Sequence, residues 1–250
     1  MSEIEKQLLP NLAEIWQKTL GWEPDELQQQ QFQQLYEGIL LGNRQLNLTR
    51  ITAPKDFWEK HLWDSLVGIK YLDYLNCREK RETLRAIDIG TGAGFPGIPV
   101  AIAFPAWTVT LLDATRKKIN FLQELVAAVG IENVKTITGR AEAIGREKLH
   151  RETYDLALLR AVGAVSVCAE YALPLIKIDG LAILYRGRWS EEDNLALESA
   201  ASKLGGKIEF IEELKTPLTD SIRHCVYLRK LSRTPAQFPR AVGLPTRQPL

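Results

Sequence analysis

The chain has 250 residues, of which 45% are hydrophobic and 25% charged, and its formal net charge is +1. These numbers fit a soluble globular protein whose length suits one α/β domain with a small helical attachment. Three cysteines without a C-x-x-C pair argue against a disulfide framework or a zinc site, so no bound metal is expected. No apolar stretch approaches the length of a membrane span, and we expect a cytoplasmic protein that contacts no membrane.

The first part of the chain is predicted to form a helical N-terminal cap over residues 1–82. Apolar residues recur at helical spacing in three stretches, 4–16, 27–40 and 54–69. The charged segment 77–82 follows them and is predicted to be a linker. We therefore expect a helical extension attached to a domain with a different pattern of apolar residues.

From residue 84 onward, short apolar runs alternate with helical patterns. The predicted strands are 84–90, 107–113, 133–138, 154–160, 180–186, 207–213 and 222–230. The predicted helices between them are 97–104, 115–129, 141–150, 163–177 and 190–204. This alternation predicts a Rossmann-like α/β fold with a mostly parallel seven-stranded sheet. The last two strands are joined without a helix, so the last strand should be antiparallel, which gives an α/β domain over 83–231 and a basic C-terminal tail over 232–250.

A glycine-rich stretch follows the first predicted strand and reads AIDIGTGAGFPG over residues 86–97. It lacks the lysine of a nucleoside-triphosphate loop. The dinucleotide fingerprint G-x-G-x-x-G can also be found, from Gly92 to Gly97. This register extends the strand to Thr91 and so buries the carboxylate of Asp88 inside the strand. In the register D-x-G-x-G-x-G the strand ends at Gly90, and Asp88 can orient loop amides or a cofactor's ammonium group. This register is associated with S-adenosylmethionine, and the alternative is a tight turn that binds no ligand. The register makes four residues candidates for cofactor binding: Asp88, Gly90, Gly92 and Gly94.

Acidic residues follow the next two predicted strands. Asp113 ends the second strand, where a carboxylate receives a ribose diol in such folds, or it caps the following helix. After the third strand, GRAE places Ala141 and Glu142 where an adenine amine could be recognised, although an acid in the first turn of a helix is favourable without a ligand. With the glycine loop, these acids favour a methyl donor over a dinucleotide.

The fourth strand ends in Arg160, near the place where this fold usually binds its acceptor. The sequence here lacks the Asn/Asp-Pro-Pro-Tyr/Phe motif of enzymes that methylate exocyclic amines, and Cys168 lies among apolar residues as a buried structural thiol would. A guanidinium that ends a buried strand needs a structural carboxylate or an anionic ligand group. An acceptor that needs no base, such as guanine N7, is compatible with these observations.

Several stretches resemble the bacterial ribosomal RNA small subunit methyltransferase G family, also called glucose-inhibited division protein B. They are LNLT (46–49), HLWDS (61–65), DIGTGAGFPG (88–97), GRAE (139–142), RA (160–161) and the ending over 238–250. The resemblance covers the chain from about residue 42 to the end. It implies methylation of guanine N7 in 16S ribosomal RNA, at position 527 of the standard rRNA numbering, by direct in-line transfer from S-adenosylmethionine during ribosome maturation.

By motif position, the resemblance also implies a set of cofactor residues and no general base. The set is Gly90, Phe95, Asp113, Ala114, Thr115, Ala141, Glu142 and Arg160. Phe95 would be an apolar wall near the methyl donor, and Arg160 is the candidate catalytic residue. His61 and Asp64 are one helical turn apart, and we expect them to link the helical cap to the core in preference to contacting substrate.

The partner that the resemblance implies is 16S rRNA or the small ribosomal subunit, bound by a monomer. Six basic residues and no acidic residue lie between Ser221 and Leu250, so we expect this basic segment to contact RNA phosphates. The candidate RNA-binding residues are Arg50, Arg186, Arg233, Arg240 and Arg247. Two other functions stay open at this point: an NAD-dependent oxidoreductase, and a catalytically silent RNA-binding module with the same fold.

Overall fold

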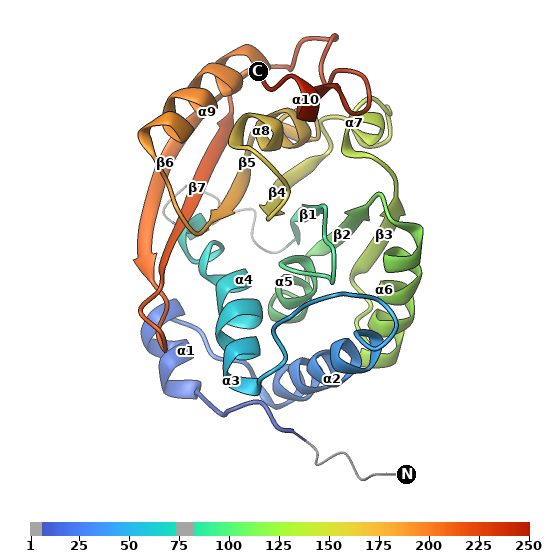
Figure 1. Ribbon diagram of the computed structural model, residues 1–250, viewed down its shortest axis with the longest axis vertical. Helices are drawn as coiled ribbons and strands as arrows, with labels where there is room; N and C mark the ends of the chain where they lie inside the picture. Colours follow the sequence, from blue (N-terminus) through green and yellow to red (C-terminus); the bar gives the residue numbers. More distant parts are fainter. Residues whose placement is uncertain (1–6, 74–82) are drawn as a thin grey trace.

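The computed structural model describes residues 7–73 and 83–250, and its centre is a seven-stranded sheet (Figure 1). The strands are β1 (Arg85–Ile89), β2 (Thr108–Asp113), β3 (Val134–Thr138), β4 (Tyr154–Arg160), β5 (Ile176–Arg186), β6 (Gly206–Lys215) and β7 (Ile222–Lys230). Their order is β3-β2-β1-β4-β5-β7-β6, and β7 is antiparallel to both of its neighbours while the other pairs are parallel. The predicted fold class is confirmed. The predicted linker 77–82 and the domain boundary at residue 82 lie outside the described residues.

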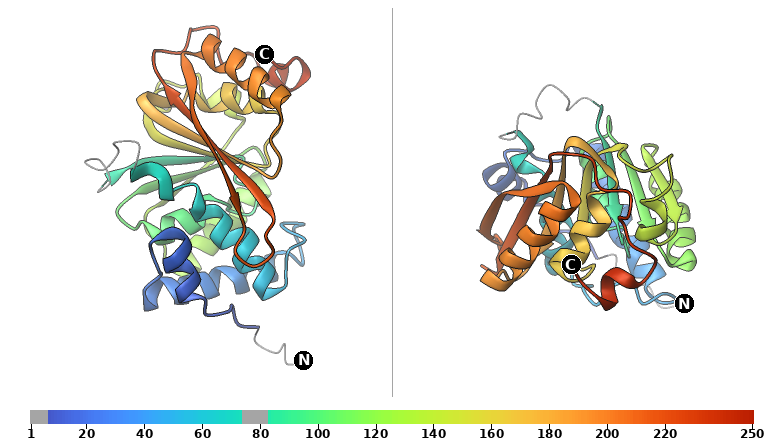
Figure 2. Two further views of the ribbon diagram at one scale, coloured as in Figure 1. Left: turned by 90° about the vertical axis from the view of Figure 1, so that its left-hand side faces the viewer. Right: turned by 90° about the horizontal axis from the view of Figure 1, so that it is seen from above.

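Helices cover both faces of this sheet. They are α1 (Ala13–Leu20), α2 (Glu26–Gly42), α3 (Pro54–Phe57), the π-helix η1 (Trp58–Trp63), α4 (Asp64–Val67), the 3-10 turn η2 (Lys70–Asp73), α5 (Gly97–Ala103), α6 (Arg116–Val129), α7 (Ala141–Ile144), α8 (Val165–Ala172), α9 (Glu191–Leu204) and α10 (Leu244–Arg247). The cap helices α1 to α4 lie with α5 and α6 on one face, and α7, α8 and α9 lie on the other (Figures 1 and 2). Within the described ranges, no helix is long and apolar enough to cross a bilayer.

Each face of the sheet has its own hydrophobic core, because successive side chains of a strand point to opposite faces. In β1, Ile87 and Ile89 belong to the core beneath α8 and α9, whereas Ala86 belongs to the core beneath the cap. Trp16 of α1 and Tyr227 of β7 are both buried in this second cluster. The cap and the sheet therefore fold around a shared core.

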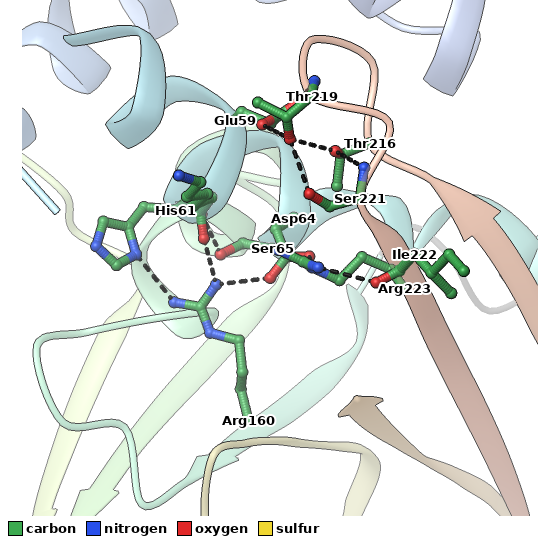
Figure 3. Close-up of polar contacts among 11 residues, drawn as sticks. Glu59, His61, Asp64, Ser65, Arg160, Thr216, Thr219, Ser221, Ile222 and Arg223 are labelled. Carbon is green, nitrogen blue, oxygen red and sulfur yellow. Dashed lines mark hydrogen bonds and ion pairs between the residues drawn. The ribbon is translucent and has the colours of Figure 1, made fainter. Parts of the chain in front are cut away.

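Glu59 of η1 attaches the cap to the hairpin turn between β6 and β7 (Figure 3). Its carboxylate accepts hydrogen bonds from the backbone amides of Leu218 and Thr219 at 2.6 and 2.9 Å, and from the Thr219 hydroxyl at 2.7 Å. The residue is 1% exposed. A carboxylate so thoroughly desolvated is tolerated because three donors satisfy it.

The helices differ from the sequence-based prediction in four places. The 4–16 pattern is not helical over residues 7–12, because α1 begins only at Ala13 and runs to Leu20. The 163–177 pattern ends at Ala172, because Ile176 already begins β5 and pairs with Tyr154. The 141–150 pattern forms only the short α7, after which the chain continues in hydrogen-bonded turns. The 54–69 pattern is interrupted by η1, whose wider π-helical turn carries His61.

Candidate functional site

The loop after β1 leaves the sheet at Gly90. Gly90, Gly92 and Gly94 have φ angles of 73°, 60° and 94°, in the left-handed region that glycine enters without strain. A Cβ at Gly94 would lie 2.4 Å from Cδ1 of Ile98, so this position also lacks room for a side chain. β1 ends at Ile89. The structure therefore has the D-x-G-x-G-x-G register and not the later dinucleotide register.

Asp88 fixes the glycine loop from inside the protein. Its Oδ2 accepts hydrogen bonds from the Thr91 hydroxyl at 2.6 Å and from the Gly97 amide at 2.8 Å. The side chain is fully buried, and burial raises the pKa of Asp88 to about 6 against the opposing effect of these two hydrogen bonds. Of the two roles expected for Asp88, the geometry supports the orientation of loop amides.

A cavity of about 310 Å³ opens at the carboxyl ends of β1 to β4, and we call it the cofactor cavity because residues predicted to bind the cofactor line it. It is lined by Ile89, Gly90, Leu112, Asp113, Ala114, Thr115, Gly139, Arg140, Ala141, Glu142, Ala161, Val162, Tyr171 and Thr246. Six of the predicted cofactor residues are in this lining: Gly90, Asp113, Ala114, Thr115, Ala141 and Glu142. The other predicted residues lie outside it: Asp88, Gly92, Gly94, Phe95 and Arg160.

Asp113 holds the loops after β1 and β2 together. Its Oδ2 accepts from the Gly92 amide at 3.0 Å, and its Oδ1 accepts from the Thr115 amide at 2.8 Å. Thr115, not Asp113, occupies the N-cap position of α6, so the simple helix-capping interpretation of Asp113 is wrong. Each carboxylate oxygen has a second lone pair, which leaves Asp113 able to accept from a ligand hydroxyl.

Glu142 also lines the cofactor cavity and is 1% exposed. Its Oε1 accepts from Arg140 Nη2 at 3.0 Å, from the Tyr171 hydroxyl at 3.2 Å and from the Gly243 amide at 2.9 Å. Burial acts to raise the pKa of Glu142, but the hydrogen bonds from Arg140 and Gly243 outweigh it and keep the pKa below its ordinary value. Oε2 accepts from Arg140 Nε at 3.3 Å and is the oxygen with more capacity left for a ligand amine.

Arg160 joins β4 to the cap (Figure 3). Its Nη1 donates to the Lys60 carbonyl at 3.0 Å and to Oδ2 of Asp64 at 3.1 Å, and its Nη2 lies 3.3 Å from Nδ1 of His61. Arg223 of β7 donates to the other oxygen of Asp64 at 3.1 Å. Arg160 was expected to pair with either a structural carboxylate or an anionic ligand group, and the structure supplies the carboxylate of Asp64. The expected role of His61 and Asp64 in linking the cap to the core is confirmed.

Phe95 faces the cap and not the cofactor cavity. Its ring stacks on His61 with the ring centres 4.3 Å apart and the planes at 7°. The guanidinium carbon of Arg160 lies 5.5 Å from the centre of the same ring. Within the cavity lining, apolar side chains come from Ile89, Leu112 and Val162.

The pH dependence of stability should report on His61. Burial, with a smaller contribution from Arg160, lowers the pKa of His61 from 6.5 to about 3. Between these values the unfolded chain binds a proton that the folded chain does not, so the free energy of unfolding falls as the pH is lowered. The difference in melting temperature between the wild type and His61→Gln should therefore shrink between about pH 7 and about pH 4. A difference that stays constant across this range would contradict the assignment.

A second cavity, of about 470 Å³, adjoins the cofactor cavity and is here called the arginine cavity. It is lined by Asp64, Arg160, Ala161, Tyr185, Arg186, Gly187, Arg188, Asp193, Arg223, His224 and Cys225. Ala161 lines both cavities. The lining contains four arginines and two aspartates, so its net positive charge favours binding of an anionic ligand.

Two cations of the basic segment expected to contact RNA are engaged within the protein. Arg240 forms an ion pair with the buried Glu170 at 2.6 Å, and Lys230 is itself 0% exposed, so neither is a free surface cation. The remaining candidates differ in their setting. Arg50, Arg233 and Arg247 are exposed, and Arg186 is half-buried and lines the arginine cavity.

Eight residues of the cofactor cavity lining were not predicted as cofactor residues from the sequence: Ile89, Leu112, Gly139, Arg140, Ala161, Val162, Tyr171 and Thr246. A polar contact of Tyr171 could have been predicted, because a tyrosine hydroxyl in an apolar helix usually forms a hydrogen bond. The place of Thr246 could not, since its position depends on how the C-terminal segment folds back.

Comparison with known proteins agrees with this geometry. Residues 28–226 match the model of the family described as rRNA small subunit methyltransferase G. The chain is 61% identical to the ribosomal RNA small subunit methyltransferase G of Nostoc punctiforme, over 97% of this chain and 99% of that protein. It is 56% identical to the protein of the same name from Trichodesmium erythraeum, over 100% of this chain and 98% of that protein.

The fold is also similar to that of a solved rRNA-modifying enzyme. A mutant of the 16S rRNA (adenine(1408)-N(1))-methyltransferase from Catenulisporales acidiphilia has a TM-score of 0.52 at 13% identity, over 65% of this chain and 92% of that chain. This likeness concerns the methyltransferase fold alone. The family match, the close relatives and the glycine loop with its cavity together show that the chain belongs to the rRNA small subunit methyltransferase G family of S-adenosylmethionine-dependent enzymes.

Proposed function

We propose that this enzyme transfers a methyl group from S-adenosylmethionine to N7 of a guanine in 16S rRNA, at position 527. The observation that supports the proposal best is the pair of adjoining cavities that share Ala161. One holds residues of the cofactor motif, and the other is lined with arginines. A donor and an acceptor bound in these two cavities would meet at their common boundary, which is the alignment that group transfer requires.

The cofactor cavity has the chemistry needed for the adenosyl group. Ile89, Leu112 and Val162 supply apolar walls, and Asp113 stands where a carboxylate receives ribose hydroxyls in related folds. A Cβ at Gly90 would lie 3.1 Å from Cγ2 of Val162, so glycine keeps this part of the cavity open. When bound, S-adenosylmethionine supplies a methyl group on a positively charged sulfur.

The arginine cavity is suited to a nucleotide of the RNA. Guanidinium groups bind phosphate oxygens and base carbonyls through planar pairs of N–H donors. Cys225 also lines this cavity, but burial raises its pKa well above the ordinary value, so it does not supply a thiolate nucleophile. This supports direct transfer without a covalent intermediate.

Guanine N7 has a lone pair and no proton, so its methylation needs no general base. The enzyme's task is then to align acceptor and donor, and Arg160 is the residue that we place beside the acceptor. It lines the arginine cavity and is held in place by Asp64. Because N7 must keep its lone pair free, the arginines would bind phosphate or O6 of the guanine and not N7.

The decisive experiment maps the methylated nucleotide. The purified protein is incubated with methyl-labelled S-adenosylmethionine and with 16S rRNA or small subunits from cells that lack the protein, and the product is analysed by mass spectrometry. We expect one methyl group on N7 of a guanine. Methylation of another atom would contradict the proposal, and an NAD-dependent oxidoreductase or a silent RNA-binding module would transfer no methyl group.

RNA affinity should depend on two arginines of the arginine cavity, Arg186 and Arg188. Arg188 is exposed, and Arg186 is half-buried and donates to the Gly163 carbonyl at 2.8 Å. If each neutralises a phosphate, replacing either with alanine should reduce the slope of log affinity against log salt concentration by about 1. Filter binding at several salt concentrations measures this slope, with Lys148→Ala as an exposed-charge control. Unchanged slopes for both arginine variants would remove them from the RNA interface.

The substrate also supports a location and an assembly state. We propose that the enzyme works in the cytoplasm, where small subunits are assembled, and that it acts as a monomer. Sedimentation of the free protein at working concentration tests the second point, since a stable dimer would contradict it.

A further inference from the structure

The C-terminal segment 234–247 is docked on the protein and is not a free basic arm. Thr234 is 5% exposed, and Arg151 donates to the carbonyl oxygens of Thr234 and Phe238 at 2.8 Å each. Figure 1 shows α10, within this segment, beside α8 and α7. The segment therefore has a defined path across the face of the protein that carries the cofactor cavity.

A buried ion pair fixes the middle of the segment. Glu170 of α8 is 0% exposed and accepts from Nε and Nη2 of Arg240 at 2.9 and 2.6 Å, and from the Arg240 amide at 2.7 Å. A carboxylate buried within an apolar helix is strongly unfavourable without a partner. The docked position of the segment is therefore the one in which Glu170 is satisfied.

The end of the segment reaches the cofactor cavity itself. The Gly243 amide donates to Oε1 of Glu142 at 2.9 Å, and Thr246 is part of the cavity lining. Glu142 is also the residue predicted to recognise the adenine. The segment and a bound cofactor would thus both contact Glu142 in one cavity.

We infer that residues 240–247 form one wall of the cofactor cavity, so that docking of this segment and binding of S-adenosylmethionine strengthen each other. The inference rests on the proposed placement of the cofactor in this cavity. The coupling is reciprocal, because the factor by which the docked segment raises cofactor affinity is also the factor by which the cofactor favours docking. The segment thereby acts on the cofactor and not directly on the RNA.

A shortened chain tests the first half of this coupling. A protein that ends after Val242 keeps Arg240 and its pairing with Glu170 but loses the Gly243 amide and Thr246. Its dissociation constant for S-adenosylmethionine, measured by isothermal titration calorimetry, should rise by about tenfold. Its melting temperature without cofactor should change little, because the buried pair is retained. A protein that ends after Arg247 is the matched control and should bind the cofactor as the full chain does.

A second variant releases the segment at its anchor. Arg240→Ala combined with Glu170→Gln removes the pair without leaving a buried charge, and should weaken cofactor binding to a similar extent. Lys148→Ala, which also removes one positive charge, is the control and should bind normally.

Limited proteolysis tests the reciprocal half. Trypsin cleavage after Arg240 and Arg247 of the full chain should be slowed by saturating S-adenosylmethionine. Equal cofactor affinity of the full chain and the chain ended after Val242 would overturn the inference alone. Failure of both to bind S-adenosylmethionine would overturn the placement of the cofactor as well.

Discussion

Arg160→Ala should destabilise the protein by about 3 kcal/mol and lower turnover by roughly 100-fold. The side chains of Arg160 and Asp64 are 16% and 10% exposed, so the substitution leaves a largely buried carboxylate without one of its two arginine partners. For a chain of this length the loss corresponds to a fall of roughly 6–12 °C in melting temperature. Turnover falls because η1 and the loop that carries Phe95 lose their common support beside the acceptor. Thermal melting and methyl-transfer assays measure the two effects.

Two variants separate these effects of Arg160. Arg160→Lys keeps the charge but loses the planar pair of donors, so it should restore part of the melting temperature and little of the turnover. Arg186→Ala also removes an arginine from the arginine cavity, but should leave the melting temperature nearly unchanged. Normal turnover in Arg160→Ala would remove Arg160 from the acceptor site, and an unchanged melting temperature would contradict its structural role.

Gly97→Ala should weaken S-adenosylmethionine binding by about tenfold and destabilise the fold by about 1–3 kcal/mol. A Cβ at Gly97 would lie 2.3 Å from Cδ2 of Leu111 and 2.8 Å from Oδ2 of Asp88. Both neighbours belong to central strands, so their backbones cannot move aside and the clash must be relieved by their side chains. The new methyl group would push Asp88 away from the Gly97 amide and the Thr91 hydroxyl, and the glycine loop would lose its internal support. Calorimetry with the cofactor and thermal melting measure the two changes.

Gly163→Ala is the matched control for Gly97. Gly163 also lies in a loop at the carboxyl end of the sheet, but an added Cβ would meet Cγ1 of Val167 at 3.8 Å, an ordinary contact. We expect cofactor affinity and melting temperature close to those of the wild type. If Gly97→Ala behaved like this control, the Asp88 contact would not be what positions the loop.

The sheet could be predicted because its signals are local. Each strand is a short apolar run bounded by turn residues, and β4 spans the predicted residues 154–160. The start of β5 was missed because Lys177, Ile178 and Asp179 are exposed, so this part of the strand does not look like a buried one. The register of the glycine loop was predictable for a similar reason, since a carboxylate two residues before the first glycine is stable only where loop amides can reach it.

The contacts of the cofactor cavity were harder to predict, because they join distant parts of the chain. Arg240 counted as a free cation in the sequence, yet it pairs with Glu170, seventy positions earlier in the chain. The sequence around Glu170 did indicate such a pair, since a carboxylate in the middle of an apolar helix requires a cation buried beside it. Nothing local indicates that Thr246 reaches a cavity built by β1 to β4. The contacts of Phe95 could not be predicted, because its neighbours in space, His61 and Phe57, belong to the cap.

The contact between Glu59 and the hairpin turn, and the core shared by Trp16 and Tyr227, have a consequence for synthesis of the protein. The helices made first share their core with strands made last, so this core is completed only when nearly all of the chain has left the translating ribosome. A fragment cut back to the α/β region would expose to water the part of the apolar sheet face that the cap covers. We therefore expect the α/β region to depend on the N-terminal helices for its stability.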